Sequence, residues 1–249
     1  MSAGTVLVTG AARRLGRAIV LELAGAGYDV AVHFNSSHDD AEITASEVRK
    51  LGCKAALIEA DLSDEIQVET IVPAAARALG PLTALVNNAS VFKDDRIETM
   101  TRASWDMHIE TNLRAPLVLS QAFARQLPEG QDGAIVNIID QAVWKLTPHF
   151  LSYLVSKAGM WTLTQTLAQG LAPRIRVNGV GPGPTLKAAQ QSAANFARQV
   201  DATLLKRAPE LTDIAGAVRY LLAAKAVTGQ MIAVDSGEHL AWATGDMYD

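Results

Sequence analysis

Short runs of apolar, mostly β-branched residues alternate with longer segments of helical spacing along the whole chain. The strand-like runs cover residues 6–9, 30–34, 55–60, 84–87, 134–139, 175–180 and 231–234. Helical spacing is clearest over residues 15–26 and 39–50, and Gly27, Gly52 and Gly80-Pro81 mark breaks in the pattern. Strands that alternate with helices of this length predict βαβ units, and therefore a parallel sheet with helices on both faces.

Seven candidate strands in one series predict a doubly wound, Rossmann-type α/β sheet, because a barrel needs eight regular units. No repeat, low-complexity tract or linker divides the chain, so residues 1–249 are expected to form one domain. Residues 186–209 are polar, rich in glutamine and alanine, and unlike a strand. We expect them to form a helical lid over the substrate, with an ordinary surface helix as the alternative.

The composition is that of a globular protein, with 49% hydrophobic and 19% charged residues and a net charge of −4. These values exclude a disordered chain and a broad nucleic-acid-binding surface. The only cysteine, Cys53, cannot form an internal disulfide. No apolar run approaches the ~20 residues of a membrane helix, and the first strand begins too early to follow a signal peptide. We expect a cytoplasmic protein with no membrane or nucleic-acid partner.

The turn after the first strand has the composition of a phosphate-binding site. Residues 9–16 read Thr-Gly-Ala-Ala-Arg-Arg-Leu-Gly. Gly10 permits a tight turn, and Gly16 allows the following helix to pack closely while its N-terminus faces a pyrophosphate. The adjacent Arg13 and Arg14 would add guanidinium donors for a multiply charged phosphate. A purely structural turn with two solvated arginines is the alternative.

The end of the second strand bears on the choice of nicotinamide cofactor. Residues 33–37 read His-Phe-Asn-Ser-Ser, and no carboxylate follows until Asp39. An NAD enzyme usually places an acid here to bind the ribose 2′-hydroxyl, and an acid would repel a 2′-phosphate. The residues able to donate hydrogen bonds to such a phosphate are His33, Asn35, Ser36 and Ser37. The sequence therefore favours NADP(H), unless these polar residues merely begin a loop.

In this order, the motifs resemble those of the short-chain dehydrogenase/reductase superfamily. The spacing of Gly10 and Gly16 is similar to its TGxxxGxG pattern, and Asp61-Leu62 looks like its acidic–apolar pair beside the adenine. Residues 87–90, Asn-Asn-Ala-Ser, are similar to its NNAG motif. The cofactor-binding residues are expected to be Gly10, Arg13, Arg14, Leu15, His33, Asn35, Ser36, Ser37, Asp61, Leu62, Asn88, Ala89, Ser90, Tyr153, Lys157, Pro182, Gly183 and Thr185.

Tyr153 and Lys157 are candidate catalytic residues, because an i, i+4 spacing puts both side chains on one helical face. A free tyrosine has a pKa of about 10, so it needs a nearby cation to favour its phenolate near neutrality. Lys157 would supply that cation and could also bind the nicotinamide ribose. Asn112 stands where the superfamily keeps an asparagine that anchors a water for proton relay. A structural role inside a helix is the alternative for Asn112.

One position departs from the superfamily pattern. Most members carry a serine thirteen residues before the tyrosine, and its hydroxyl polarises a substrate carbonyl; here that residue is Asp140. A carboxylate beside a carbonyl oxygen is repulsive. It suits a substrate with a ring nitrogen to protonate, or with an amino-pyrimidine edge to bind. This Asp-x12-Tyr-x3-Lys arrangement resembles the pteridine reductases.

Further residues are similar to that family. Its fingerprint has an arginine where Arg14 stands, and its NNAS motif is followed by a phenylalanine that stacks on the pterin, as Ser90 and Phe92 are placed here. Residues 178–183 resemble its Asn-Gly-Val-x-Pro-Gly stretch, and Thr185 its following hydroxyl. The likeness extends to residues 229–237, where Ser236 replaces a commoner glycine. The substrate-binding residues implied are Arg14, Ser90, Phe92, Asp140 and Tyr153.

The resemblance implies an NADPH-dependent reductase of a pterin, dihydropterin or dihydrofolate. Phe92 and the nicotinamide would sandwich the ring, and Asp140 with Tyr153 would protonate the nitrogen next to the carbon that accepts hydride. A short-chain alcohol dehydrogenase or carbonyl reductase, and a catalytically weak NADP-binding sensor or subunit, are the alternatives. No metal site is predicted. Relatives are usually tetramers, so a homotetramer with interfaces near residues 102–127 and 154–171 is expected.

Overall fold

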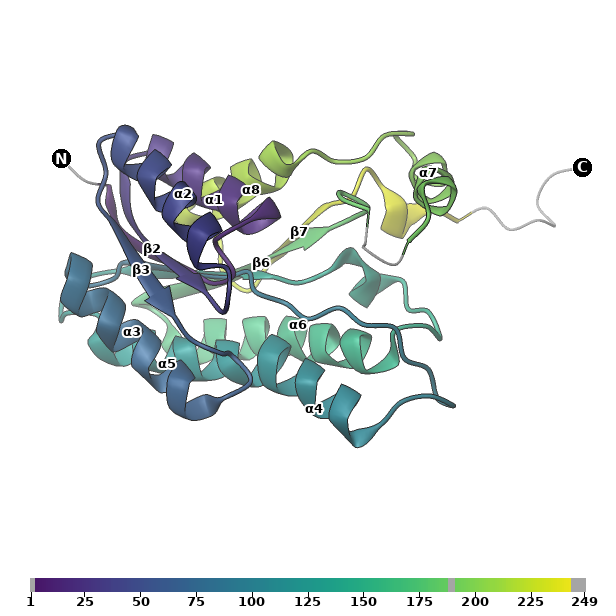
Figure 1. Ribbon diagram of the computed structural model, residues 1–249, viewed down its shortest axis with the longest axis horizontal. Coiled ribbons are helices and arrows are strands. Elements are labelled where there is room, and N and C mark those ends of the chain that lie inside the picture. Colours follow the sequence, from purple (N-terminus) through teal and green to yellow (C-terminus); the bar gives the residue numbers. More distant parts are fainter. Residues whose placement is uncertain (1–2, 188–190, 243–249) are drawn as a thin grey trace, which may run out of the picture.

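The computed structural model describes residues 3–187 and 191–242, and within them the strands form a single sheet (Figure 1). The strands are β1 Gly4–Val8, β2 Tyr28–Phe34, β3 Ala55–Glu59, β4 Ala84–Asn87, β5 Gly133–Ile138, β6 Ile175–Pro182 and β7 Met231–Val234. Their order is β3-β2-β1-β4-β5-β6-β7, and every neighbouring pair is parallel. The predicted seven-stranded Rossmann-type sheet is confirmed, and each predicted strand overlaps an observed one.

Helices cover both faces of the sheet. They are α1 Arg14–Gly25, α2 His38–Lys50, α3 Glu65–Leu79, α4 Arg102–Ile109, α5 Ala115–Gln126, α6 Leu151–Leu171, α7 Ala193–Asp201 and α8 Leu211–Ala223. Three short turns of other helical types are η1 Glu110–Arg114, η2 Gln141–Trp144 and η3 Glu238–Leu240. Figure 1 shows α1, α2 and α8 on one face and α3, α5 and α6 on the other. None of the helices in the described ranges is both long and apolar enough to cross a membrane.

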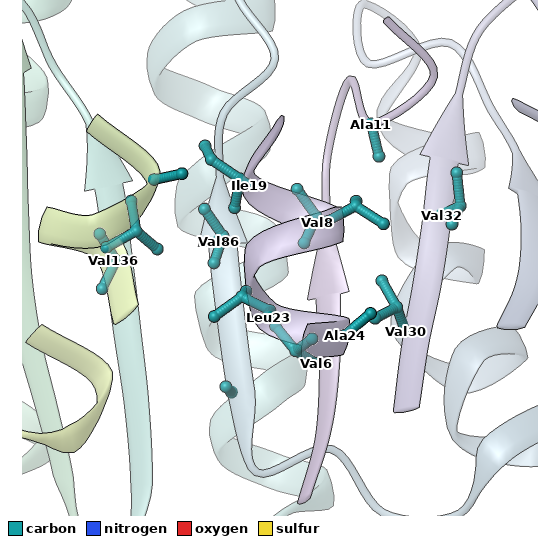
Figure 2. Close-up of a cluster of buried hydrophobic side chains, with 14 of the residues drawn as sticks. Val6, Val8, Ala11, Ile19, Leu23, Ala24, Val30, Val32, Val86 and Val136 are labelled. Atoms are coloured by element: carbon teal, nitrogen blue, oxygen red, sulfur yellow. The ribbon is translucent and has the colours of Figure 1, made fainter. Parts of the chain in front are cut away.

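The core under α1 shows why the alternating pattern folds in this way. Ile19 and Leu23 point from α1 onto Val6 and Val8 of β1, and Val86 of β4 lies beside them (Figure 2). All five side chains are completely buried. Burial of a side chain of this size stabilises the fold by roughly 1.5–3 kcal/mol. The apolar runs are continuous rather than alternating because both faces of the sheet are covered.

The fold places the candidate chemistry at one edge of the sheet. In a parallel sheet all carboxyl ends lie on the same side, and ligands bind where the strand order reverses, here between β1 and β4. Within the predicted lid, residues 186–209, the structure forms α7 beside this edge (Figure 1). Residues 188–190 of that segment lie outside the described ranges.

Candidate active site

A cleft of about 1080 Å³ opens at the carboxyl edge of the sheet. Its walls come from the turns that follow β1, β2, β4, β5 and β6, together with parts of α6, α7 and η3. The predicted residues that line it are Gly10, Arg13, Arg14, Leu15, Asn35, Ser36, Ser37, Asn88, Ala89, Ser90, Phe92, Asp140, Tyr153, Lys157, Pro182, Gly183 and Thr185. The other four predicted residues do not line it: His33, Asp61, Leu62 and Asn112.

The β1–α1 turn is held tightly against the end of β4. The Thr9 hydroxyl accepts hydrogen bonds from the backbone N–H groups of Asn88 at 2.9 Å and Ala89 at 3.0 Å. The Asn88 amide donates to the carbonyls of Thr9 and Gly10. A Cβ atom added to Gly16 would lie 2.0 Å from the Gly10 carbonyl oxygen, so only glycine fits there. The packing leaves a narrow cradle of the kind that takes a pyrophosphate at a helix N-terminus.

Arg13 and Arg14 both face the cleft from this turn. Arg14 has a φ of +51°, so it keeps the left-handed backbone expected of the glycine that it replaces. The Arg13 guanidinium lies 3.6 Å from the Asp40 carboxylate, and its side chain is 64% exposed. Both cations are therefore accessible to an anionic ligand next to Ser36 and Ser37.

His33 is not placed to bind a 2′-phosphate, and that prediction is wrong. Its side chain is 2% exposed beneath the turn. Nδ1 accepts a hydrogen bond from the backbone N–H of Gly10 at 3.1 Å, so Nε2 carries the proton and donates to the Ala60 carbonyl at 3.2 Å. Burial lowers the pKa of His33 to about 4, so the ring is neutral near pH 7. It supports the turn from below.

Asp61 and Leu62 lie beside the cofactor end of the cleft and do not contribute to its wall. The Asp61 carboxylate accepts hydrogen bonds from the backbone N–H and the hydroxyl of Ser63, both at 2.8 Å. These bonds lower the pKa of Asp61, and a weaker contribution comes from the side chain of Asn35, which does line the cleft. Asp61 is therefore linked to the candidate cofactor site through Asn35.

The candidate catalytic side chains meet at the centre of the cleft. The Tyr153 hydroxyl donates to Oδ2 of Asp140 at 2.6 Å, and Oδ1 of Asp140 accepts from the backbone N–H of Ala142 at 2.8 Å. The Lys157 ammonium donates to the carbonyl of Ile138 at 2.9 Å. Tyr153 and Lys157 project from the same face of α6, while Asp140 stands directly after β5. Three of the four predicted catalytic residues, Asp140, Tyr153 and Lys157, therefore line the same part of the cleft, whereas Asn112 does not line it.

Burial controls the electrostatics of this group. It raises the pKa of Asp140, although hydrogen bonds from Tyr153 and Ala142 and the charge of Lys157 act against it. Burial, followed by the charge of Asp140 and the hydrogen bond to it, raises the pKa of Tyr153 well above its usual value. The Asp140 carboxylate opposes ionisation of Tyr153 in this arrangement, and the effect of Lys157 on the Tyr153 phenolate stays a prediction. Burial lowers the pKa of Lys157 to about 8.

An aromatic wall lies over the catalytic group. Phe92 stacks on Phe150 with ring centroids 4.6 Å apart, and it meets Tyr153 edge to face at 4.7 Å. Phe92 remains 39% exposed, so part of its ring faces the cleft, and Ser90 lines the cleft two residues earlier. A flat ring could pack against this surface while its polar edge reaches Asp140 and Tyr153.

Asn112 holds the loop that carries Ser90 and Phe92. Its Oδ1 accepts from the backbone N–H of Val91 at 2.8 Å, and its Nδ2 donates to the Val91 carbonyl at 2.9 Å and to Ser156 at 3.1 Å. The side chain lies in the π-helical turn η1 and is 1% exposed. The hydrogen bonds of the Asn112 amide thus position the loop; a relay water is left as a prediction.

The family model for short-chain dehydrogenases matches residues 4–197. The chain belongs to the short-chain dehydrogenase family. Among curated relatives, it is 34% identical over 241 residues to 3-oxoacyl-(acyl-carrier-protein) reductase FabG from Staphylococcus epidermidis, which covers 95% of this chain and 99% of the relative.

Solved structures extend the comparison. FolM alternative dihydrofolate reductase 1 from Brucella suis, in complex with NADP, is 48% identical, covers 99% of both chains and has a TM-score of 0.95. The corresponding protein from Brucella canis, also with NADP, is 47% identical over 99% of this chain and 98% of that one, with a TM-score of 0.93. A blue fluorescent protein from a metagenomic library, bound to NADPH, is 33% identical over 95% of this chain and 98% of that one, with a TM-score of 0.90.

Sequence reasoning missed several residues that line the cleft of this short-chain dehydrogenase, among them Gln141, Phe150, Gln199 and Glu238. Phe150 stands three residues before Tyr153, so its proximity to the helix start could have been noticed. Glu238 lies after the last strand. Because the carboxyl ends of all parallel strands lie at one edge of the sheet, it could have been predicted to lie near the cleft. Gln199 belongs to α7, within the segment predicted as a lid.

Proposed function

We propose that the chain is an NADPH-dependent reductase of a pterin-like ring, that is, a pterin, dihydropterin or dihydrofolate. The observation that carries the proposal is the 2.6 Å hydrogen bond between Tyr153 and Asp140, at the position where most family members have a serine. A carboxyl group paired with a phenol can supply a proton to a ring nitrogen. The exposed face of Phe92 beside this pair fits a flat heteroaromatic substrate.

The residues present fit NADP(H), which two of the similar structures contain as NADP and another as NADPH. Gly10 and Gly16 form the cradle for the pyrophosphate, because a side chain at Gly16 would collide with the turn. Arg13, Ser36 and Ser37 would hold the 2′-phosphate. Lys157 and the residues 182–185 line the part of the cleft where the nicotinamide riboside would bind.

Bound NADPH would supply the hydride, and the protein's own groups would orient the ring and deliver a proton. Phe92 holds the ring face, and Arg14 and Ser90 lie on the side where its polar edge would bind. Tyr153 would donate its proton to the ring nitrogen as hydride reaches the adjacent carbon, and protonated Asp140 would pass its own proton to Tyr153, so that the pair is left with one proton and one negative charge. Positive charge on Lys157 stabilises the anionic pair that remains.

A carbonyl reductase is the second candidate, and the 34% identity to a 3-oxoacyl-(acyl-carrier-protein) reductase favours it. Tyr153 and Lys157 would serve either reaction. The difference is Asp140, because a buried carboxylate would repel the developing oxyanion that a serine hydroxyl would stabilise.

We also propose a cytoplasmic homotetramer, as is usual for the family, with α4, α5 and α6 at its interfaces. Sedimentation equilibrium of the purified chain would test the assembly: a mass near 106 kDa is expected from the chain mass of 26.5 kDa. A monomer at micromolar concentration would contradict it.

Variants of Asp140 separate the two candidate reactions. Asp140→Asn keeps the shape of the side chain and loses the acid, so dihydropterin reduction should fall roughly 10²-fold or more. Asp140→Ser should not restore it. Steady-state kcat/KM of wild type and both variants would be measured on dihydrobiopterin and on a β-ketoacyl ester. A wild type inert on pterins, together with a faster serine variant on the ketone, would overturn the proposal.

A further inference from the structure

Glu238 adds a carboxylate to the cleft besides Asp94 and Asp140, at the end away from the phosphate turn. Glu238 belongs to η3 after β7, whereas Arg14 follows β1 and Ser90 follows β4. In the order β1-β4-β5-β6-β7, Asp140 at the end of β5 stands between these groups. A ring bound at Asp140 would have Arg14 and Ser90 on one side and Glu238 on the other.

Two amides from different parts of the chain hold the Glu238 carboxylate. Oε2 accepts from Nε2 of Gln141 in η2 at 2.8 Å, and Oε1 accepts from Nε2 of Gln199 in α7 at 2.9 Å. Gln199 in turn accepts from the amide of Gln191 at 3.1 Å. All four side chains line the cleft. Each carboxylate oxygen can accept a further hydrogen bond, so the group remains available to a ligand.

The short turn that carries Glu238 is fixed in place. Asp235 is 3% exposed and accepts from the backbone N–H of Gly237 at 2.9 Å and of His239 at 2.8 Å. The His239 ring packs against Trp144 of η2 with centroids 5.1 Å apart. Because neighbours on both sides constrain η3, Glu238 is already oriented before a ligand arrives.

The amide of Gln141 has spare hydrogen-bonding capacity beside Glu238. Gln141 is 7% exposed and donates through Nε2 to Glu238, yet its Oε1 is buried with no hydrogen-bond partner among the described residues. An unsatisfied buried acceptor is costly.

The charge of this end of the cleft restricts what can bind. Beside Glu238, the described lining residues of α7 and its approach are uncharged: Gln191, Asn195, Phe196 and Gln199. Burial raises the pKa of Glu238, and the negative charges of Asp140 and Asp235 raise it further. Lys145 offsets part of this charge without lining the cleft. An anionic substituent would be repelled here, whereas a neutral group with hydrogen-bond donors would be held.

We propose that Glu238, supported by Gln141 and Gln199, is the specificity-determining residue of the cleft, which binds a neutral hydroxylated substituent of the substrate and disfavours an anionic one. The inference rests on the proposed function, and it specifies the chemical class of the substituent on the pterin-like ring.

Three probes that differ only in the substituent test the inference: dihydrobiopterin with two hydroxyls, 6-methyldihydropterin with none, and dihydrofolate with a carboxylate tail. The kcat/KM of each would be measured for wild type and for Glu238→Gln, which keeps the shape and loses the charge. A second readout is the affinity of biopterin, 6-methylpterin and folate for the NADP⁺ complex, by calorimetry. Glu129→Gln, an exposed carboxylate away from the cleft, is the matched control.

In Glu238→Gln, we expect the preference for the hydroxylated over the methyl probe to fall about tenfold in both readouts, as for loss of one hydrogen bond to a charged acceptor. The kcat/KM for dihydrofolate, relative to that for 6-methyldihydropterin, should rise. Unchanged ratios, or a uniform loss on all three probes, would overturn the inference and leave Glu238 a structural residue. Failure of the proposed function looks different, because wild type would then reduce none of the three probes.

Discussion

At the scale of single residues, the main chemical feature is a proton held between Asp140 and Tyr153. Two acidic groups 2.6 Å apart in a buried site cannot both ionise without a large electrostatic cost, and the pKa of each is raised. The site is therefore organised to retain a proton at neutral pH. Lys157, with a pKa lowered to about 8, supplies the balancing charge only below that pH.

Tyr153→Phe should remove most of the turnover and leave cofactor binding nearly unchanged. The substitution deletes one hydroxyl and keeps the ring that packs on Phe92, and loss of a positioned acid costs roughly 10²–10⁴-fold in rate. Fluorescence titration with NADPH would measure binding, and single-turnover NADPH oxidation with dihydrobiopterin would measure chemistry. A variant that keeps wild-type turnover would place the proton donor elsewhere.

His33 should make the fold sensitive to acid. Its native pKa of about 4 lies below the usual 6.5, so between these values the unfolded chain binds a proton that the native chain does not. The free energy of unfolding should therefore fall as pH decreases from about 6.5 to about 4, by up to about 3 kcal/mol. Urea unfolding at several pH values would show a flatter profile for His33→Gln.

The exposed His38 provides the control for that experiment, since its side chain is 64% exposed at the start of α2. His38→Gln should leave the pH profile of wild type intact. A His33→Gln protein as acid-sensitive as wild type would mean that other groups control the transition.

At the scale of elements, the start of α6 decides where Tyr153 and Lys157 lie. Asp95 is 3% exposed and accepts through Oδ1 from the backbone N–H of Ser152 at 3.0 Å. Its Oδ2 accepts from the hydroxyls of Ser152 and Ser104. The Ser152 hydroxyl also contacts Nδ1 of His108 at 2.7 Å. Although burial raises it, these hydrogen bonds bring the pKa of Asp95 below its usual value.

Asp95→Ala should destabilise the protein by about 2–4 kcal/mol, because it leaves several buried donors without an acceptor. It should also reduce kcat, since the first turn of α6 loses its anchor. Urea unfolding and steady-state kinetics would measure both effects. Asp106→Ala is the matched control: this partly exposed carboxylate pairs with Arg102 along α4, and its loss should cost no more than about 0.5 kcal/mol. Equal effects of the two variants would contradict the assignment.

Element order and strand positions could be predicted because each depends on local pattern. The backbone at Arg14 and Ser236 could not, since both residues replace glycines yet keep positive φ angles of +51° and +54°. The surrounding turns impose that conformation despite a cost of about 1 kcal/mol each. The prediction that His33 binds a phosphate was wrong for a related reason. Whether a side chain at the end of a strand faces the cleft or the interior depends on packing against the neighbouring strands, and periodicity alone does not show this packing.

At the scale of the whole molecule, the site is assembled from residues that follow six parallel strands. No single segment of the described chain contains all of its residues. Residues as distant as Gly10 and Glu238 line one cleft because the carboxyl ends of β1 and β7 share an edge. Glu238 could have been considered only through the predicted sheet order, whereas Tyr153, Lys157 and Asp140 could be found by their spacing in the sequence. Catalytic residues that lie close together in the sequence can be recognised from their spacing. Residues that are distant in the sequence but share the cleft can be recognised only once the order of the strands is known.

Because the cofactor cradle joins so many elements, its occupation should stabilise the entire fold. At NADPH concentrations about 100 times Kd, binding to the native state alone contributes about 2.7 kcal/mol. For a chain of this size that corresponds to a rise in Tm of roughly 5–10 °C.

NADH at the same concentration should raise Tm less, since Arg13, Ser36 and Ser37 would have no 2′-phosphate to bind. Arg13→Glu should reduce the NADPH shift to that of NADH, while Lys225→Glu, an equal charge change at an exposed site outside the cleft, should not. Equal Tm shifts with the two cofactors in wild type would contradict the assignment of the second strand's end to a 2′-phosphate.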